Sequence, residues 1–107
     1  MVLIMVTLWY PPDKGIEVGK KYLGVMQKFP LESFEKPLVP VGVSPSKDGI
    51  KGISITEVEK GKYEETLNLV ARRMVEFHGI EGFRYEIKTL LTGEEAMPLI
   101  GLKMPAV

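Results

Sequence analysis

The sequence predicts one α+β domain, residues 1–107, with a four-stranded antiparallel sheet and two helices. The first ten residues, MVLIMVTLWY, carry no charge and are apolar at both odd and even positions, as in a strand covered on both faces. Two later segments repeat apolar residues at steps of three and four, which is typical of amphipathic helices. Three further segments are rich in strand-forming residues and are bounded by turn residues, so the order of elements is β-α-β-β-α-β.

The first strand spans residues 2–10 and ends at Pro11 and Pro12, because proline cannot donate a ladder hydrogen bond. Asp13 is placed to cap the helix that follows, and Pro30 ends that helix. The apolar stripe of this first helix consists of Val18, Tyr22, Val25, Met26 and Phe29.

The second strand, residues 37–44, contains Pro40, which predicts a position at the edge of the sheet. The Asp-Gly pair at 48–49 predicts a hairpin turn. The third strand follows that turn over residues 50–59.

The second helix, residues 62–78, has the clearest pattern in the chain. Its buried stripe is Tyr63, Leu67, Val70, Ala71, Met74 and Phe77. Its polar side is Glu64, Glu65, Asn68, Arg72, Arg73 and Glu76. The fourth strand spans 82–91, and Thr92 with Glu95 forms a capping-box pattern that predicts a short helical turn.

This order of elements is the split βαβ, or ferredoxin-like, arrangement. Right-handed crossovers place strands one and three at the centre and both helices on one face. The residues expected to face the helices are Val2, Ile4, Val6, Leu8, Val39, Val41, Val43, Ile53, Ile55, Phe83, Tyr85 and Ile87. Those expected on the opposite face are Leu3, Met5, Thr7, Trp9, Leu38, Pro40, Gly42, Ser54, Thr56, Val58, Arg84, Glu86, Lys88 and Leu90. That opposite face is too apolar to be bare in water, and we expect a second copy of the chain to cover it.

In element order, length and doubly apolar first strand, the chain resembles the dimeric α+β barrel superfamily. The segment TGEEAMPLIG after the fourth strand is also similar to the acid-rich helical turn that closes many such domains. The resemblance implies a sheet-to-sheet homodimer, or a higher oligomer built from dimers, with a small-molecule pocket. It leaves the chemistry open, because members include cofactor-free monooxygenases, haem-dependent enzymes, isomerases, stress proteins and ligand-sensing domains.

We therefore predict a protein that binds a small organic molecule between sheet and helices. If the protein is an enzyme, we expect a cofactor-independent activity of monooxygenase or isomerase type. Thr7 and Trp9 would shape the site, Arg84 would orient an anionic group and Glu86 would line the site beside it. His78, the chain's single histidine, is the candidate for proton transfer. The alternative is a non-catalytic structural or interaction module, with the sheet face filled by its partner.

Each candidate residue also has a structural interpretation. Arg84 and Glu86 could form an ion-pair row with Lys88 that keeps an edge strand soluble. Trp9 could be ordinary core or interface packing, and His78 could be exposed at a helix end. Ligation of a haem by His78 also stays open.

Acidic and basic residues balance at 14 each, so the chain has no excess positive charge for nucleic acid. The chain has no cysteine, which excludes disulfides, thiolate metal sites and a cysteine nucleophile. We expect no metal and no cofactor. We also expect no membrane partner, because no apolar run is long enough to span a bilayer. The expected location is the cytoplasm.

Overall fold

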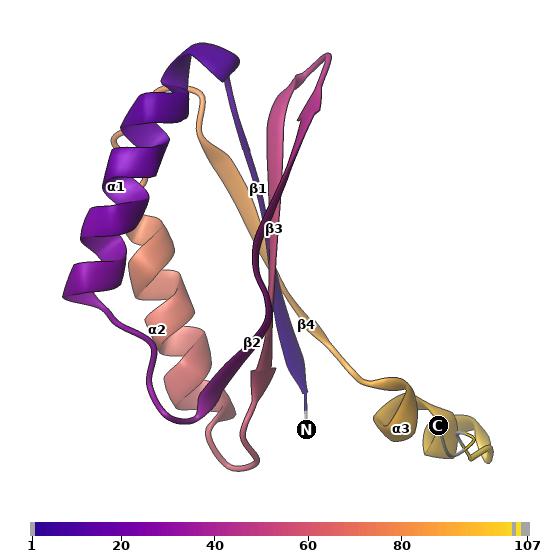
Figure 1. The fold of residues 1–107 in the computed structure, drawn as a ribbon. Coiled ribbons are helices and arrows are strands. Elements are labelled where there is room, and N and C mark those ends of the chain that lie inside the picture. The colour runs from indigo at the N-terminus through magenta and orange to yellow at the C-terminus, as the bar shows by residue number, and fades with distance from the viewer. Residues whose placement is uncertain (1, 104, 106–107) are drawn as a thin grey trace.

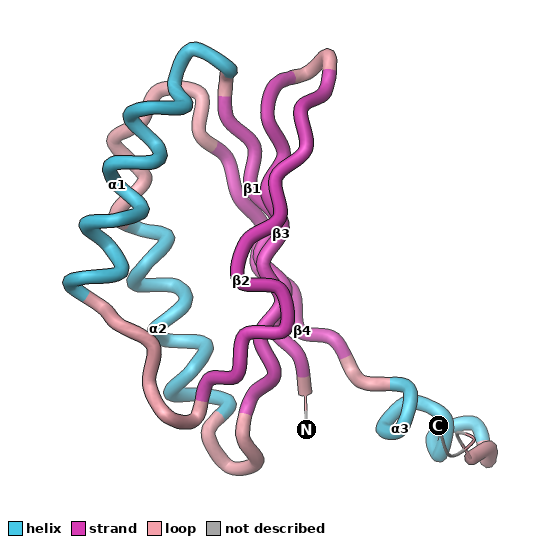
Figure 2. The backbone as a smooth tube through the Cα atoms, viewed as in Figure 1, coloured by secondary structure: helices cyan, strands magenta, loops and turns pink. Residues whose placement is uncertain are grey.

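Two helices cover one face of a four-stranded antiparallel sheet and leave the other face uncovered (Figure 1). The computed structural model describes residues 2–103 and 105. Its elements in chain order are β1 (Leu3–Tyr10), α1 (Gly15–Lys28), β2 (Glu35–Ser46), β3 (Gly49–Val58), α2 (Tyr63–Val75), β4 (Arg84–Leu90) and α3 (Gly93–Ala96), with 3₁₀ helices at Pro12–Lys14 and Met97–Ile100. The strand order β2-β3-β1-β4 confirms the predicted ferredoxin-like arrangement. Figure 2 shows the two long helices on one side of the strands.

Strand β1 is central and pairs antiparallel with both β3 and β4. Its even-numbered residues face α1 and α2, where Ile4 and Val6 join the buried core. Residues directly opposite one another in a ladder share a face, so the register of β1 assigns the faces of its neighbours. We call the face away from the helices the open face; it carries Leu3, Met5, Thr7, Trp9, Lys51, Ile53, Ile55, Glu57, Arg84, Glu86, Lys88 and Leu90.

The predicted orientation of β3 is wrong. Ile53 lies opposite Thr7 and Ile55 lies opposite Met5, which puts both isoleucines on the open face. Ser54, Thr56 and Val58 therefore face the helices instead. This register sets Gly52 opposite Leu8, where a Cβ would lie 2.8 Å from the Leu8 Cδ1 atom, so the absence of a side chain at position 52 suits it. The helix-facing parity of β3 is the one that includes this glycine, and alternation of apolar and polar residues alone could not reveal it.

Strand β2 lies at the edge of the sheet, as Pro40 predicted. Its pairing with β3 has two register irregularities, one on either side of Val39. The expected common face of Val39, Val41 and Val43 is therefore wrong, because Val39 pairs with Ile55 on the open face. Bulges of this kind bend an edge strand, and here they shape one wall of a cavity.

The predicted cap at Asp13 is also wrong. The consecutive prolines begin a 3₁₀ helix at Pro12–Lys14, so α1 starts two residues later, at Gly15, without a side-chain cap. The capping box at Thr92 and Glu95 is confirmed, since each side chain accepts a hydrogen bond from the other residue's backbone N–H. None of the helices in the described residues has the length and apolar character needed to cross a bilayer.

Candidate functional site

An apolar cavity of about 130 Å³ lies between the helix layer and the sheet. Two strands and two helices contribute side chains: Ile4, Val6 and Leu8 from β1, Ser54 and Thr56 from β3, Tyr22, Val25 and Met26 from α1, and Val70, Arg73, Met74 and Phe77 from α2. Pro37, Pro40 and Val41 of the bulged β2 and Leu31 of the loop before it complete the lining. Leu31, Val41 and Tyr22 are exposed to solvent, which places the opening between α1 and β2.

The size of this cavity suits a ring-sized molecule. An engineered apolar cavity of about 150 Å³ in another protein stays dry and binds benzene. The cavity here has a similar volume and a mainly aliphatic and aromatic lining, with the hydroxyls of Ser54 and Thr56 on the sheet side. It can therefore hold a small apolar molecule and offer it a few hydrogen-bonding groups.

Arg73 brings a charge to the wall of the cavity, but Glu35 at the start of β2 neutralises it. The guanidinium Nη1 donates to Glu35 Oε1 at 2.5 Å and Nη2 donates to Glu35 Oε2 at 2.8 Å. Arg73 also donates from Nε to the Phe29 carbonyl at 2.9 Å and from Nη2 to the Pro30 carbonyl at 3.0 Å. The side chains are only 10% and 1% exposed, so this bidentate pair is buried and its partners are satisfied.

The ion pair also determines the protonation of Glu35. Burial raises the pKa of this carboxyl, but hydrogen bonds from Arg73 and from the Glu32 backbone N–H, together with the charge of Arg73, outweigh burial. The net result is a pKa below the ordinary glutamate value, and Glu35 is ionised at neutral pH.

Four of the predicted site residues come together on the open face. Thr7 lies directly opposite Glu86, and Trp9 lies directly opposite Arg84, in neighbouring rows of the β1–β4 ladder. Thr7 is buried, Trp9 is half-buried and the two charged residues are exposed. Lys88 continues the row along β4, and its Nζ atom lies 3.0 Å from Glu86 Oε1, which supplies one ion pair of the row considered as an alternative. The positions of these residues are compatible both with a ligand site and with an ion-pair row on β4. None of these residues lines the cavity.

The structure does not bring His78 to those four residues. His78 is exposed in the turn after α2, where its Nε2 atom lies 2.7 Å from the Tyr85 hydroxyl and its ring stacks on Tyr85. Tyr85 pairs with Leu8 and so faces the helices. Because α2 packs on that side of the sheet, His78 lies across the sheet from the open face. It does not line the cavity either.

No cluster of three or more histidine, aspartate or glutamate side chains with the geometry of a metal site occurs in residues 2–103 and 105. Glu76, one of the carboxylates that a site at His78 would need, instead pairs with Lys28 at 2.6 Å.

The residue that sequence reasoning missed is Arg73, which was assigned to the exposed side of the second helix. The spacing along the helix was an available signal, because Thr66, Val70, Arg73 and Phe77 follow steps of four, three and four. The structure shows that all four are buried. An arginine on a buried stripe needs a buried partner, and the sequence does not identify Glu35 as that partner.

No model of a known protein family matches the chain, and no curated protein matches it in sequence. Solved structures do match. A candidate antibiotic biosynthesis monooxygenase from Deinococcus radiodurans superimposes with a TM-score of 0.58 at 15% identity, over 88% of this chain and 94% of that chain. The de novo designed protein Foldit4 gives a TM-score of 0.56 at 15% identity, over 85% of this chain and 96% of that chain. PelD from Pseudomonas aeruginosa PAO1 gives 0.50 at 12% identity, over 92% of this chain and 34% of that chain.

These similarities define a ferredoxin-like α+β domain. They confirm the predicted fold and leave the dimeric arrangement to be tested. At identities this low a shared fold carries no activity from one protein to another. One of the similar structures is a designed protein, which illustrates that this architecture can exist without an inherited function.

Replacing Arg73 with methionine should destabilise the fold by about 3–5 kcal/mol, because the Glu35 carboxylate would be left buried without its partner. Chemical unfolding followed by circular dichroism measures this loss. Arg72→Met is the matched control on the exposed side of α2 and should change stability by no more than about 0.5 kcal/mol. Adding Glu35→Leu to Arg73→Met should restore much of the lost stability; equal effects at positions 72 and 73 would contradict a buried role.

The same pair predicts a pH dependence. Because the pKa of Glu35 is lowered in the folded state, its contribution to stability is present above the unfolded-state pKa of about 4.3 and is lost as the pH falls through the folded value. NMR of the Glu35 carboxyl carbon should show titration below that of an unfolded glutamate. The free energy of unfolding should fall over the same range of pH. A Glu35 titration at or above the ordinary value would contradict the pairing.

Proposed function

We propose that the protein binds a small, neutral and largely apolar molecule in the cavity between sheet and helices, as a homodimer whose two open faces pack together. The observation that carries the binding proposal is an apolar cavity whose one charged wall residue, among the described lining residues, is already neutralised.

The hydrogen bonds of Arg73 explain why the ligand is neutral. An arginine has five N–H donors, and four hydrogen bonds already engage this guanidinium with Glu35 and two backbone carbonyls. An anionic ligand would have to displace Glu35 from Arg73 and leave a second negative charge in a buried site. A neutral ring would instead contact the aliphatic part of Arg73 and the apolar side chains around it.

The lining also favours binding over acid–base catalysis. The lining residues that the structure describes include no histidine, aspartate, glutamate or lysine. A monooxygenase- or isomerase-type reaction therefore stays a prediction, supported by the likeness in fold to a candidate monooxygenase. The expected cytoplasmic location also stays a prediction.

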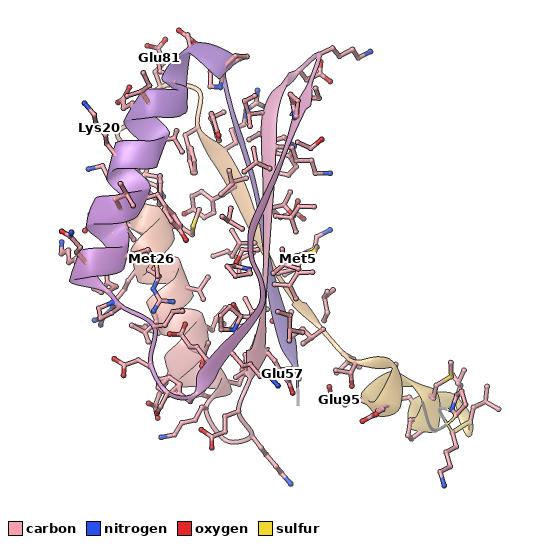
Figure 3. All side chains as sticks on the ribbon, in the orientation of Figure 1. Met5, Lys20, Met26, Glu57, Glu81 and Glu95 are labelled. Carbon is pink, nitrogen blue, oxygen red and sulfur yellow. The ribbon has the colours of Figure 1, made fainter. Side chains whose placement is uncertain are left out.

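The open face supports the homodimer. Its central rows are apolar at Leu3, Met5, Ile53 and Ile55, and Figure 3 shows Met5 on the side of the sheet that the helices leave uncovered. Acidic and basic residues are equal in number, so two copies meet without net repulsion. A face of this kind on a small domain is typical of an interface.

The patch of Thr7, Trp9, Arg84 and Glu86 is a second candidate site, for a small anion. Its support is the direct pairing of Trp9 with Arg84, which puts an arginine and a tryptophan at opposite positions of the ladder at one end of the open face. In a non-catalytic module, the partner copy would fill both this patch and the rest of the face.

Fluorobenzene should bind to the protein and lose about tenfold in affinity in Val41→Phe, because the new ring occupies the cavity. Fluorine NMR of the probe measures the affinity. Val43→Phe is the matched control, since Val43 lies on the same edge strand outside the cavity lining and should leave binding unchanged.

Benzoate distinguishes the two candidate sites. Benzoate binding that survives Val41→Phe and is lost in Arg84→Ala would assign ligand binding to the open-face patch. An absence of binding for both probes would favour the non-catalytic interaction module.

Met5→Lys should convert the dimer to monomers, because the new ammonium group would be buried without a partner at the interface. Sedimentation velocity measures the oligomeric state. Trp9 is the only tryptophan and lies on the same face, so its emission should shift to the red on dissociation. Ile16→Lys on the exposed side of α1 is the control. An unchanged oligomer in Met5→Lys would show that another surface is used.

A further inference from the structure

The C-terminal arm, residues 91–103, extends beyond the end of β4 and away from the sheet (Figures 1 and 2). The chain is correspondingly elongated, with extents of 48 × 32 × 20 Å and a radius of gyration of 15.6 Å. A compact domain of this length has a radius of gyration of roughly 13 Å. The arm thus projects from a body that is otherwise folded on itself.

The arm is held in a defined shape by local hydrogen bonds. The capping box at Thr92 starts α3, and the 3₁₀ helix Met97–Ile100 follows it directly. Gly101, in the left-handed conformation at φ 75°, ends that helix, and the Leu102 N–H donates to the Met97 carbonyl at 3.0 Å. Helices this short are not stable alone in water, because too few hydrogen bonds compensate the cost of nucleation. An arm of this shape therefore needs a surface to pack against.

The arm also exposes apolar side chains that have no other role in the described structure. Leu99 is 74% exposed, Ile100 is 71%, Leu102 is 57% and Leu91 is 50%. These side chains lie close together in sequence on a segment with regular structure. Exposed apolar residues grouped in this way are typical of an interaction surface.

We propose that this arm packs on a second copy of the chain and that the two arms of a dimer are exchanged reciprocally. The proposal rests on the homodimer proposed above. In Figure 1 the arm lies on the side of the sheet opposite the helices, which is the side of the open face. A copy stacked on the open face therefore comes within reach of the arm. In a two-fold dimer one contact between arm and partner is made twice, so the apolar side chains of both arms are covered together.

The test compares two pairs of equally exposed apolar residues. Leu99→Asp combined with Ile100→Asp on the arm should weaken dimerisation at least tenfold, as measured by sedimentation equilibrium. Ile16→Asp combined with Leu23→Asp on α1 is the matched control, at 77% and 65% exposure, and should leave the dimer unchanged. Circular dichroism of both variants verifies that the body of the domain stays folded.

Photo-crosslinking identifies the surface that the arm touches. A variant with p-benzoylphenylalanine in place of Ile100 is mixed with isotope-labelled wild-type protein and irradiated. Mass spectrometry then distinguishes links between chains from links within one chain. Links between chains, from position 100 to the labelled copy, are the expected result.

The outcomes separate this proposal from the dimer itself. A dimer that persists in the arm variant, with no link between chains, would overturn the exchanged arm and leave the open-face dimer standing. Links confined to one chain would show that the arm folds back on its own domain, which also overturns the exchange. A monomeric wild-type protein would overturn both the dimer and the exchange.

Discussion

The arrangement of the helix layer over the sheet depends on the buried pair of Arg73 and Glu35. Arg73 belongs to α2, whereas Glu35 begins β2 and the carbonyls of Phe29 and Pro30 follow α1. One guanidinium therefore joins α2 to the connection between α1 and β2, 38 to 44 residues away in sequence. Removing two charges from water is costly, and only a fully hydrogen-bonded geometry compensates that cost. The pair therefore tolerates little change in the distance between α2 and β2. That distance also sets the width of the cavity, because Arg73 and the bulged segment of β2 form two of its walls.

What the sequence could predict was whatever depends on neighbours along the chain. The apolar run of β1, the stripe of α2 and the capping box at Thr92 each follow from local patterns, and the structure has them. The orientation of β3 depends instead on its register with β1, and both faces of that strand carry side chains that suit burial. A short apolar alternation is satisfied by either face, so the register with β1, which sets Gly52 against Leu8, decides between them. The orientation of β3 was mispredicted because its pairing with β1 is long-range, and the sequence pattern of one strand does not contain that information.

The candidate site was predicted in part for the same reason. Cross-strand neighbours on β1 and β4 could be anticipated from alternation, and Thr7 with Glu86 and Trp9 with Arg84 do pair. A cavity between sheet and helices was expected, but its lining could not be anticipated, because it forms where the bulged β2 meets α1 and α2. His78 was considered because it is the single histidine, yet its position after α2 places it on the far side of the sheet from those four residues. Residue type suggests chemistry, but the packing of elements decides which residues can act together.

The two faces of the sheet are two separate surfaces, the open face and the face that packs against the helices. Odd-numbered residues of β1 belong to the open face, and even-numbered ones to the core and the cavity floor. A strand whose neighbours cover both faces must be apolar at both parities, which is the pattern of the first ten residues. If the open face were simply solvated, Met5 could be polar at no cost to the core, since its side chain points away from it. The apolar residues there, together with an arm on the same side of the sheet, support the proposal of one partner that covers both. Self-association on that side would leave the cavity mouth between α1 and β2 accessible, so ligand binding and dimerisation need not compete.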